Sequence, residues 1–582
     1  MAGDTDQDGY PQEIHLTMEK LRHQHIYDLA ELCFRQGIRN AVICPGSRSA
    51  PLALAFGNHP GINCHIRPDE RSAGFVALGM SQATGTPTVL VCTSGSAALN
   101  FAPAVAEAYY QQIPLLVCTA DRPPEWINQR DGQTIDQSRI YGNHIKKELQ
   151  VHADDNEAGH WIANRMMNEA ILTSLEFPAG PVHLNFPFRE PLYPTPEIAV
   201  RFGDPRIIQR SAVKVELTPA EVSSIRKLLT ATKKVLLVGG QLPPDSTLRA
   251  AVRTFSRSFQ APVITEAVSN LGNVPGAITN ADLFIGAMSD QDMAFLQPDL
   301  LITWGDGIVS RHIKAFLRKY PARDHLHVQL AGPVADTFMS LTRIIYCTPV
   351  DFFRSVNKIP ERTDRQVYKD QWKKLEKIVD HSLKFAGSSE PGWVSTLLKA
   401  IPGGTNLQLA NSLSVRYVNM LFGKRLKAEV KVWCNRGTSG IDGCTSTAVG
   451  HHLASGEPCV LITGDVAFFY DRNAFWPKAP GGGFRVVILN NRGGQIFSMI
   501  DGPRDRKEAR ALFIGDQPLD ARHLCSEYGM HYIDGRSSRD PEQLIEEFFK
   551  PRNNATVLEI FTDPVENRKT VDSLKQTLRS IL

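Results

Sequence analysis

The sequence predicts an α/β protein with three doubly wound domains, each built on a parallel β-sheet. Short apolar runs recur along the chain, and each ends in a loop rich in Gly, Ser or Asp before a helical pattern begins. Continuous apolar runs are typical of strands that are buried on both faces of a parallel sheet. The chain has 582 residues, which is too long for one hydrophobic core and long enough for roughly three domains.

The first third of the chain shows this pattern most clearly. Its strand-loop-helix runs are NAVICPGSRS, TPTVLVCTSGSAALNFAPAVAEAYY and IPLLVCTADRPPE. Residues 180–188 read as a last strand, and the Pro-rich segment EPLYPTPE follows it. Because such a segment ends regular structure, we place the first domain at residues 1–195.

A second α/β domain is predicted over residues 196–355. Its strands are expected within KKVLLVGGQLPP, APVITEA, PDLLITWGDG and DHLHVQL. The VLLVGG run lacks the full G-x-G-x-x-G pattern that would hold a pyrophosphate, so a plain strand-turn-helix is the favoured interpretation.

A charged helical linker is predicted over residues 356–390, and a third domain over 391–582, with ATVLEIFTDP as its last strand. The likeness between PVHLNFP in the first domain and VLEIFTD in the third is faint, but it favours a duplicated architecture.

Composition excludes several classes of protein. Hydrophobic residues make up 42% and charged residues 21% of the chain, and the net charge of +3 is too small to indicate a nucleic-acid or membrane partner. The ten cysteines include no C-x-x-C pair, which argues against a zinc site or a disulfide framework and favours reduced, mostly buried thiols. The N-terminal segment MAGDTDQDGYPQE is acidic and polar and contains no hydrophobic signal region, and no apolar run approaches the ~20 residues of a membrane helix. We therefore expect a cytoplasmic protein.

Oxygen-bearing side chains follow two apolar runs in the third domain. Asp465 comes directly after the first run, Asn490 and Asn491 follow the second, and Asn491 lies 26 positions after Asp465. A carboxylate and an amide oxygen from two strand ends suit a hard divalent cation that bridges to phosphate. The alternative is an ordinary strand-loop aspartate and an Asn-rich turn, which the spacing and the flanking strands make less favoured.

This spacing resembles the motif of thiamin diphosphate (ThDP) enzymes, Gly-Asp-Gly followed by Asn-Asn, although Val466 replaces the second glycine. The resemblance implies a pyruvate oxidase/decarboxylase-like architecture, with a pyrimidine-binding first domain and a diphosphate-binding third domain. It also implies that Mg²⁺ or Mn²⁺ is held by Asp465, Asn491 and the backbone carbonyl of Gly493.

The same resemblance assigns residues to the rest of the cofactor. Glu70 matches the family's catalytic glutamate, which contacts the aminopyrimidine ring and precedes a small-residue helix that the family places in the dimer core. Ile441 matches the residue that forces the bent cofactor conformation. Pro45, Ser439 and Gly440 are further expected cofactor contacts. By themselves, Asp-Glu-Arg is most often a solvated helix start and a lone Ile is core, but the family-like segment TSGSAALN and the loop around Ile441 favour the functional interpretation.

Five motifs narrow the family. ICPGSRSAPLALAF, TADRPPE, NSLSVR, NRGTSGIDG and NNRGGQIF occur in an order similar to that of the SEPHCHC synthase (MenD) family of menaquinone biosynthesis. This resemblance implies decarboxylation of 2-oxoglutarate on ThDP and 1,4-addition of the succinyl unit to isochorismate. Carbon dioxide is then released and pyruvate is not.

Both of these substrates are dianions, and arginine binds carboxylates in a bidentate manner. A lone arginine is usually solvated, so the assignment depends on its place in a strand-end motif. Ile496 and Phe497 are expected to wall the pocket, with core packing as an equal alternative, and His451 and His452 are interpreted as structural. The expected substrate-binding residues are Ser47, Arg48, Arg122, Gln133, Arg311, Ser412, Arg416, Arg436, Ile496 and Phe497.

The two halves of the expected site lie in the first and third domains, which in this family come from different subunits. The resemblance therefore implies a homo-oligomer, either a dimer or a tetramer. Two other functions stay open. A simple 2-oxoacid decarboxylase or acetolactate-type synthase would leave the arginine set without a role. A non-catalytic ThDP-fold scaffold would not need Glu70, Asp465 and Asn491.

Overall fold

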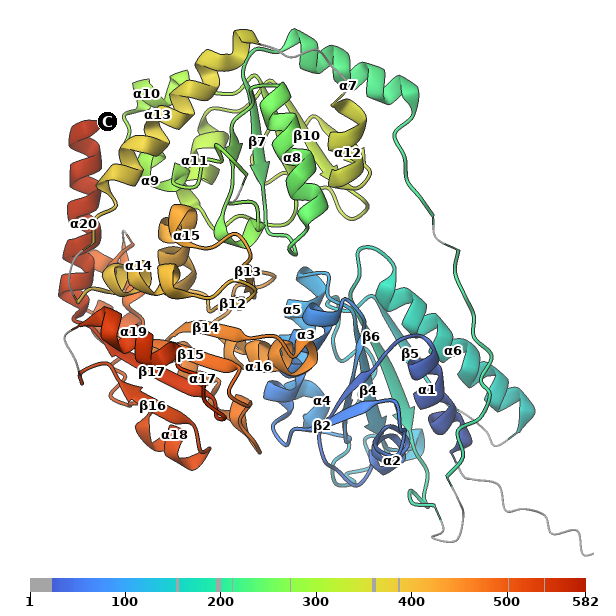
Figure 1. Cartoon of the computed structure of the whole chain (residues 1–582). Coiled ribbons are helices and arrows are strands. Elements are labelled where there is room, and N and C mark those ends of the chain that lie inside the picture. Colours follow the sequence, from blue (N-terminus) through green and yellow to red (C-terminus); the bar gives the residue numbers. More distant parts are fainter. Residues whose placement is uncertain are drawn as a thin grey trace, which may run out of the picture.

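Three parallel β-sheets, A, B and C, organise the computed structural model of the chain (Figure 1). This confirms the predicted fold class. The structure describes residues 23–152, 156–194, 200–211, 213–272, 274–357, 363–385, 388–500, 502–537 and 540–582. The predicted boundary at residues 195 and 196 and the N-terminal 22 residues lie outside these ranges, as does part of the predicted linker.

Sheet A is the N-terminal sheet and has the strand order β2-β1-β3-β4-β6-β5, with all pairs parallel. Helices α1, α2 and α6 pack on one face and α3, α4 and α5 on the other. The strands are β1 (Asn40–Ile43), β2 (Asn63–Ile66), β3 (Thr88–Cys92), β4 (Leu115–Asp121), β5 (Lys147–Gln150) and β6 (Pro181–Pro187). The helices are α1 (Gln24–Arg35), α2 (Ala50–Gly57), α3 (Glu70–Thr84), α4 (Ser96–Asn100), α5 (Ala102–Tyr110), the 3₁₀ helix η1 (Pro124–Trp126) and α6 (Glu157–Leu175).

Sheet C, in the C-terminal part, repeats this topology. Its order is β13-β12-β14-β15-β17-β16, again all parallel. Strands β6 and β17 occupy the same position in their sheets, which confirms the duplication expected from PVHLNFP and VLEIFTD. The strands are β12 (Asn406–Leu409), β13 (Lys431–Cys434), β14 (Cys459–Gly464), β15 (Phe484–Asn490), β16 (His531–Asp534) and β17 (Thr556–Phe561).

Helices and short turns complete the C-terminal part. The α-helices are α14 (Glu390–Ala400), α15 (Leu413–Arg425), α16 (Cys444–Ser455), α17 (Asp465–Tyr470), α18 (Arg522–Glu527), α19 (Pro541–Phe549) and α20 (Pro564–Ile581). The shorter elements are η4 (Arg472–Phe475), η5 (Gln495–Ser498), η6 (Pro503–Asp505) and the π-helical turn η7 (Arg510–Ile514).

Sheet B, in the central part, has the order β11-β10-β9-β7-β8 and is also parallel. Its strands are β7 (Val235–Gly239), β8 (Val263–Ile264), β9 (Leu300–Trp304), β10 (Asp324–Gln329) and β11 (Arg343–Tyr346). Its helices are α7 (Pro219–Ala231), α8 (Ser246–Ser258), η2 (Ala267–Ser269), α9 (Ala281–Ile285), α10 (Asp290–Phe295), α11 (Arg311–Lys319) and α12 (Pro349–Val356). The turn η3 (Thr363–Arg365) and helix α13 (Gln366–Ser382) lead on to α14.

Helices α3 and α16 hold sheets A and C together. A Cβ added at Gly79 would lie 2.0 Å from the Thr447 carbonyl oxygen, and one added at Gly450 would lie 2.0 Å from that of Val76. Only glycine permits so close an approach of two backbones. The small-residue helix expected around Ala73 to Gly79 therefore packs against a helix of its own chain.

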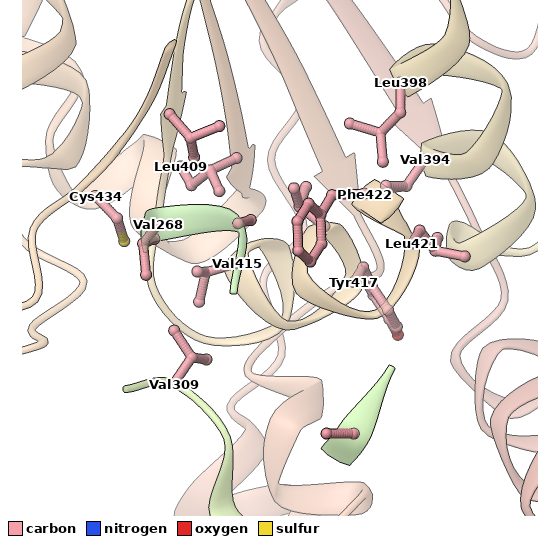
Figure 2. Packing of buried hydrophobic residues seen from close by; sticks show 14 of the residues in the cluster. Val268, Val309, Val394, Leu398, Leu409, Val415, Tyr417, Leu421, Phe422 and Cys434 are labelled. Carbon is pink, nitrogen blue, oxygen red and sulfur yellow. The ribbon is translucent and has the colours of Figure 1, made fainter. Parts of the chain in front are cut away.

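The central part packs on helix α15, which starts at the carboxyl edge of sheet C. Figure 2 shows Val268 and Val309 beside Val415 of α15, within a buried cluster that continues through Leu409 and Phe422. This packing fixes the first turn of α15, which carries two of the predicted site residues. In the part of the chain that the structure describes, no helix is long and apolar enough to cross a bilayer.

Candidate active site

A cavity of about 600 Å³ lies at the carboxyl ends of β12, β14 and β15 in sheet C. Loops at the carboxyl ends of parallel strands are where open α/β sheets bind ligands. The predicted residues that line this cavity are Ser412, Arg416, Arg436, Ser439, Ile441, Asp465, Asn491, Gly493, Ile496 and Phe497.

Asp465 is the first residue of α17 and is 2% exposed. Its carboxylate accepts hydrogen bonds from the backbone N–H of Val466 and of Gly493, both at 2.9 Å, and from Gln517 Nε2 at 3.2 Å. Burial raises the pKa of Asp465 to about 6. Val466 serves this arrangement through its backbone amide, so a side chain in place of the family's second glycine leaves the carboxylate in position.

The two asparagines have separate tasks. Asn490 is structural, because its amide donates to Glu559 Oε1 at 2.7 Å and to the Leu519 carbonyl at 3.1 Å. Asn491 lines the cavity. Its amide nitrogen donates to Glu390 Oε1 at 2.8 Å, while its buried Oδ1 has no hydrogen-bond partner among the described residues.

Asn491 Oδ1 and the Asp465 carboxylate test whether the implied metal fits. A buried amide oxygen without a partner is costly unless it has a ligand, and carboxylate, amide and carbonyl oxygens are the donors that Mg²⁺ takes. Gly493 has φ +144°, and a Cβ there would meet the Gly515 carbonyl oxygen at 2.4 Å. These residues fit a hard cation with a bound diphosphate. Among the described residues, no group of three or more His, Cys, Asp or Glu side chains could hold a metal. The donors at this site are one carboxylate, one amide oxygen and one backbone carbonyl, so they do not form a group of that kind.

Glu390 is a site residue that the sequence analysis missed. It begins helix α14, is fully buried and lines the cavity. Burial raises its pKa to about 7. Besides the Asn491 amide, it accepts a hydrogen bond from Thr562 Oγ1 at 3.4 Å. Because Glu390 accepts from the Asn491 nitrogen, it directs the Asn491 oxygen the other way.

Asn411 is a second missed residue, and it joins the loops that carry the arginines. Its amide nitrogen donates to the carbonyls of Asn435 at 2.5 Å and Gly440 at 2.6 Å. Its oxygen accepts from Arg436 Nη1 at 2.9 Å. The predicted cofactor contact Gly440 does not itself line the cavity. The hydrogen bond from Asn411 to its carbonyl holds it between the lining residues Ser439 and Ile441.

Arg416 and Arg436 line the cavity, and a third cation, Lys314, interacts with them from outside the lining. Arg416 donates to the Ser412 carbonyl at 2.6 Å, and its pKa is lowered by its desolvated surroundings and then by the charge of Arg436. The same two causes lower the pKa of Lys314, which Arg416 also approaches. Cations that repel one another are stabilised by an anion, so this cluster could bind one in addition to the nearby carboxylates of Asp282 and Glu266.

Lys314 lies on α11, three residues after the predicted Arg311. The side chain of Arg311 is exposed, and Arg311 does not line the cavity. Lys314 does not line the cavity either, but it interacts electrostatically with Arg436 and Arg416, which do. Helical spacing from Arg311 is the signal that would have found it.

An apolar wall faces the polar groups. Ile441 packs against Ala410, Cys444 and Ala467, while Phe497 lies 5.9 Å from the ring of Phe513. The short helix η5 carries both Ile496 and Phe497 into the lining.

The remaining predicted residues lie at the carboxyl edge of sheet A. Glu70 is half-buried at the first residue of α3 and does not line the sheet C cavity. Its neighbours fix it to the C-terminal part: Asp69 Oδ2 accepts from Asn473 Nδ2 at 2.7 Å, and Arg71 donates to the Tyr470 carbonyl at 2.7 Å.

Arg48 and Arg122 form a cationic pair at this second edge. Arg48 is 7% exposed, and its pKa is lowered by burial and then by the charge of Arg122. Arg48 donates to the Phe188 carbonyl at 3.1 Å, and Arg122 to the Gly132 carbonyl at 3.0 Å. The other predicted residues of sheet A, namely Pro45, Ser47 and Gln133, are exposed.

Comparisons with known proteins match the chain to one family model and to several relatives. Residues 27–140 match the model of the family described as thiamine pyrophosphate enzyme, N-terminal TPP binding domain. A protein of Cytophaga hutchinsonii is 42% identical over 564 residues, which cover 96% of this chain and 99% of that protein. A protein of Flavobacterium johnsoniae is 37% identical over 93% of this chain and 96% of its own length. One of Porphyromonas gingivalis is 36% identical over 94% of this chain and 95% of its own length. All three are named 2-succinyl-5-enolpyruvyl-6-hydroxy-3-cyclohexene-1-carboxylate synthase.

Proposed function

This chain belongs to the family of thiamin diphosphate-dependent 2-succinyl-5-enolpyruvyl-6-hydroxy-3-cyclohexene-1-carboxylate (SEPHCHC) synthases, and we propose that it makes that product from 2-oxoglutarate and isochorismate. The reaction is a decarboxylation followed by 1,4-addition of the succinyl unit to the isochorismate ring, within cytoplasmic menaquinone biosynthesis. The observation that carries the proposal is the sheet C cavity, whose lining combines an oxygen-donor pair with Arg416 and Arg436, which a third cation, Lys314, approaches.

The C-terminal edge would hold the cofactor. Asp465, Asn491 and the Gly493 carbonyl are the residues that would bind Mg²⁺ or Mn²⁺ beside the diphosphate. ThDP, when bound, supplies the nucleophilic carbon and the electron sink that decarboxylation needs. Ile441, which lines the cavity, would contact the cofactor, and the buried Glu390, by accepting from the Asn491 nitrogen, would leave the Asn491 oxygen available to the metal.

The cations hold the substrate carboxylates. Arg416 and Arg436 offer planar guanidinium groups, and Lys314 adds a third positive charge within the same group. Each charge-assisted hydrogen bond contributes on the order of 1.5–3 kcal/mol, so two dianions need several of them. A site for small monoanions such as pyruvate would not need so many charge-assisted hydrogen bonds.

The apolar wall protects the reacting carbon. Ile496 and Phe497 exclude water from this end of the cavity. Protonation there would release succinic semialdehyde, and the addition to the second substrate would be lost.

Glu70 would reach this site from a second subunit. Its carboxylate would hold a proton and exchange it with the ring of the bound cofactor. In support, Glu70 does not line the cavity of its own chain, and large apolar side chains near it are exposed: Ile66 at 48%, Tyr470 at 52% and Trp476 at 44%. Exposed apolar groups of this kind mark contact surfaces, so we propose a homo-oligomer whose active sites are shared between subunits.

A coupled assay tests the proposal. Carbon dioxide release from 2-oxoglutarate is measured with ThDP and Mg²⁺, with and without isochorismate, and the product is identified by its mass. We expect isochorismate to accelerate the release and the SEPHCHC mass to appear. Turnover of pyruvate without any effect of isochorismate would indicate a simple 2-oxoacid decarboxylase, and failure to bind ThDP with Mg²⁺ in calorimetry would indicate a scaffold.

A further inference from the structure

The loop that joins β13 to α16 supplies Arg436, Ser439 and Ile441 to the lining of the sheet C cavity. Gly437 and Thr438 belong to the same loop and do not line the cavity themselves. Ser439 has φ +62°, a left-handed conformation that is uncommon for a residue with a side chain. Such a conformation persists where surrounding contacts fix it. The groups that hold Gly437 and Thr438 therefore help to place the lining residues on either side of them.

One carboxylate of the N-terminal part holds both of these residues. Glu107, on α5, accepts from the backbone N–H of Gly437 at 2.8 Å through Oε1 and from that of Thr438 at 2.6 Å through Oε2. Oε2 also accepts from the Thr438 hydroxyl, and Oε1 accepts from Gln111 Nε2. Three of these four donors belong to the loop, and all four are uncharged.

Burial makes the contact important to both partners. Glu107 is 1% exposed, and a buried carboxylate costs free energy unless hydrogen bonds compensate it. The two backbone N–H groups are held by a single side chain, so removal of that side chain takes the acceptor from both. The carboxylate and the loop therefore order one another.

Gly437 lets the loop come close to α5. A Cβ at this position would lie 2.7 Å from the Glu107 carbonyl oxygen and 3.0 Å from the backbone nitrogen of Gln111. Only glycine permits so close an approach. The residues that line the sheet C cavity all lie at position 390 or later, so α5 acts on this cavity from behind the lining.

We propose that Glu107 is a positioning residue for the proposed reaction. Through Gly437 and Thr438 it holds the loop so that Arg436 faces the substrate carboxylates and Ile441 faces the cofactor. The identity of these two ligands rests on the proposed function, whereas the hold on the loop does not.

This assignment gives the N-terminal part of each chain two tasks. Glu107 serves the cavity of its own chain, because its hydrogen bonds reach the loop within one chain. Glu70, on α3, is proposed to serve the cavity of a second subunit. Each active site then depends on two acids of N-terminal parts, with Glu107 acting in cis and Glu70 in trans.

Hydrogen exchange of the protein without ligands tests the hold on the loop, and mass spectrometry of a peptide that contains residues 436–441 measures it. Glu107→Ala should raise the exchange rate of the Gly437 and Thr438 amides at least about 10-fold, because both lose their acceptor. Glu107→Gln keeps one carbonyl acceptor and should give a rate between those of Glu107→Ala and the parent.

Two controls separate this local effect from lost stability. Asp121→Ala also removes a buried carboxylate of the N-terminal part, and its loop peptide should exchange like that of the parent. A peptide from β15 should keep the parent's rate in Glu107→Ala. Equal loop exchange in Glu107→Ala and the parent, or a rise that β15 shares, would overturn the proposal.

Mixed refolding tests which site Glu107 serves. Glu107→Ala alone should lower kcat/KM for 2-oxoglutarate about 100-fold, because the loop is misplaced. Refolded with Glu70→Gln, it should recover to about a quarter of the parent's activity, since half of randomly formed dimers hold one intact site. Refolded with Asp465→Ala, it should not recover, because both changes damage the C-terminal edge of their own chain. Recovery with Asp465→Ala would overturn the assignment in cis.

Failure of the proposed function would look different. If Glu70→Gln and Asp465→Ala chains did not complement one another, the shared active site would be wrong, while a raised loop exchange in Glu107→Ala would still support the hold of Glu107 on the loop.

Discussion

Sheets A and C have the same strand order, yet their carboxyl edges carry different side chains. After the fourth strand of the chain in each part, sheet C presents Asn491 and sheet A presents Arg122. After the third strand, sheet C presents Asp465 and sheet A the uncharged Thr93. The C-terminal edge is therefore an oxygen-donor site with a cavity, and the N-terminal edge supplies an acid and two cations.

The duplicated fold therefore sets the positions of the strand ends, while a few residues at those ends set the chemistry. Neither edge has a complete set of groups. Removing a group from one edge should therefore impair the half of the reaction that depends on that edge.

Glu70→Gln should have the largest effect on the N-terminal edge. We expect kcat to fall about 10²–10⁴-fold, because a proton-transferring carboxylate is lost, while ThDP and Mg²⁺ still bind. Steady-state kinetics and calorimetry measure the two quantities. Full activity in this variant would remove the assigned role of Glu70.

Asp465→Ala should impair cofactor binding at the C-terminal edge, which Glu70→Gln should leave intact. We expect the gain in ThDP affinity that Mg²⁺ provides to fall at least about 100-fold, because a charged ligand of the metal is lost. Asp121→Asn is the control, since Asp121 is a buried carboxylate that ends β4 in sheet A. If Mg²⁺ improved ThDP binding equally in parent and variant, the metal assignment would be wrong.

Arg48→Ala removes a cation from the edge of sheet A, and Arg416→Ala removes one from the edge of sheet C. Each should lower kcat/KM about 10–100-fold, from the loss of charge-assisted hydrogen bonds to carboxylates, with little change in ThDP affinity. Exposed Arg311→Ala serves as the reference and should change kcat/KM less than either. A larger loss in Arg311→Ala would show that α11 approaches the substrates through Arg311 and not through Lys314.

Glu390→Leu tests whether Glu390 orients Asn491 at the C-terminal edge. Loss of the acceptor for the Asn491 amide should weaken Mg²⁺-dependent ThDP binding about 10-fold, the size expected for a group that orients a metal ligand. Glu390→Gln keeps an acceptor and should restore most of the affinity. The free energy of unfolding of both variants, measured without ligands, separates this effect from a loss of stability. If Glu390→Leu bound ThDP with Mg²⁺ as tightly as the parent, the positioning role of Glu390 would be excluded.

Much of the fold could be predicted because buried parallel strands leave continuous apolar runs in the sequence. The residues of the C-terminal edge could be named for a related reason: Asp465 and Asn491 directly follow such runs. Glu390 could not, since a Glu near a helix start is usually solvated, and its burial depends on Asn491 and Thr562, more than 100 positions away. Asn411 is fixed by loop contacts that no local pattern records.

Complementation between two inactive variants tests whether the two edges of one active site come from different subunits. Glu70→Gln and Asp465→Ala chains are unfolded and refolded together, and activity is compared with that of each variant alone. If one subunit supplies the acid and another the metal site, half of randomly formed dimers hold one intact site, and activity should recover to about a quarter of the parent's value. If each chain built its own site, the mixture would stay as inactive as its components, which would contradict the account.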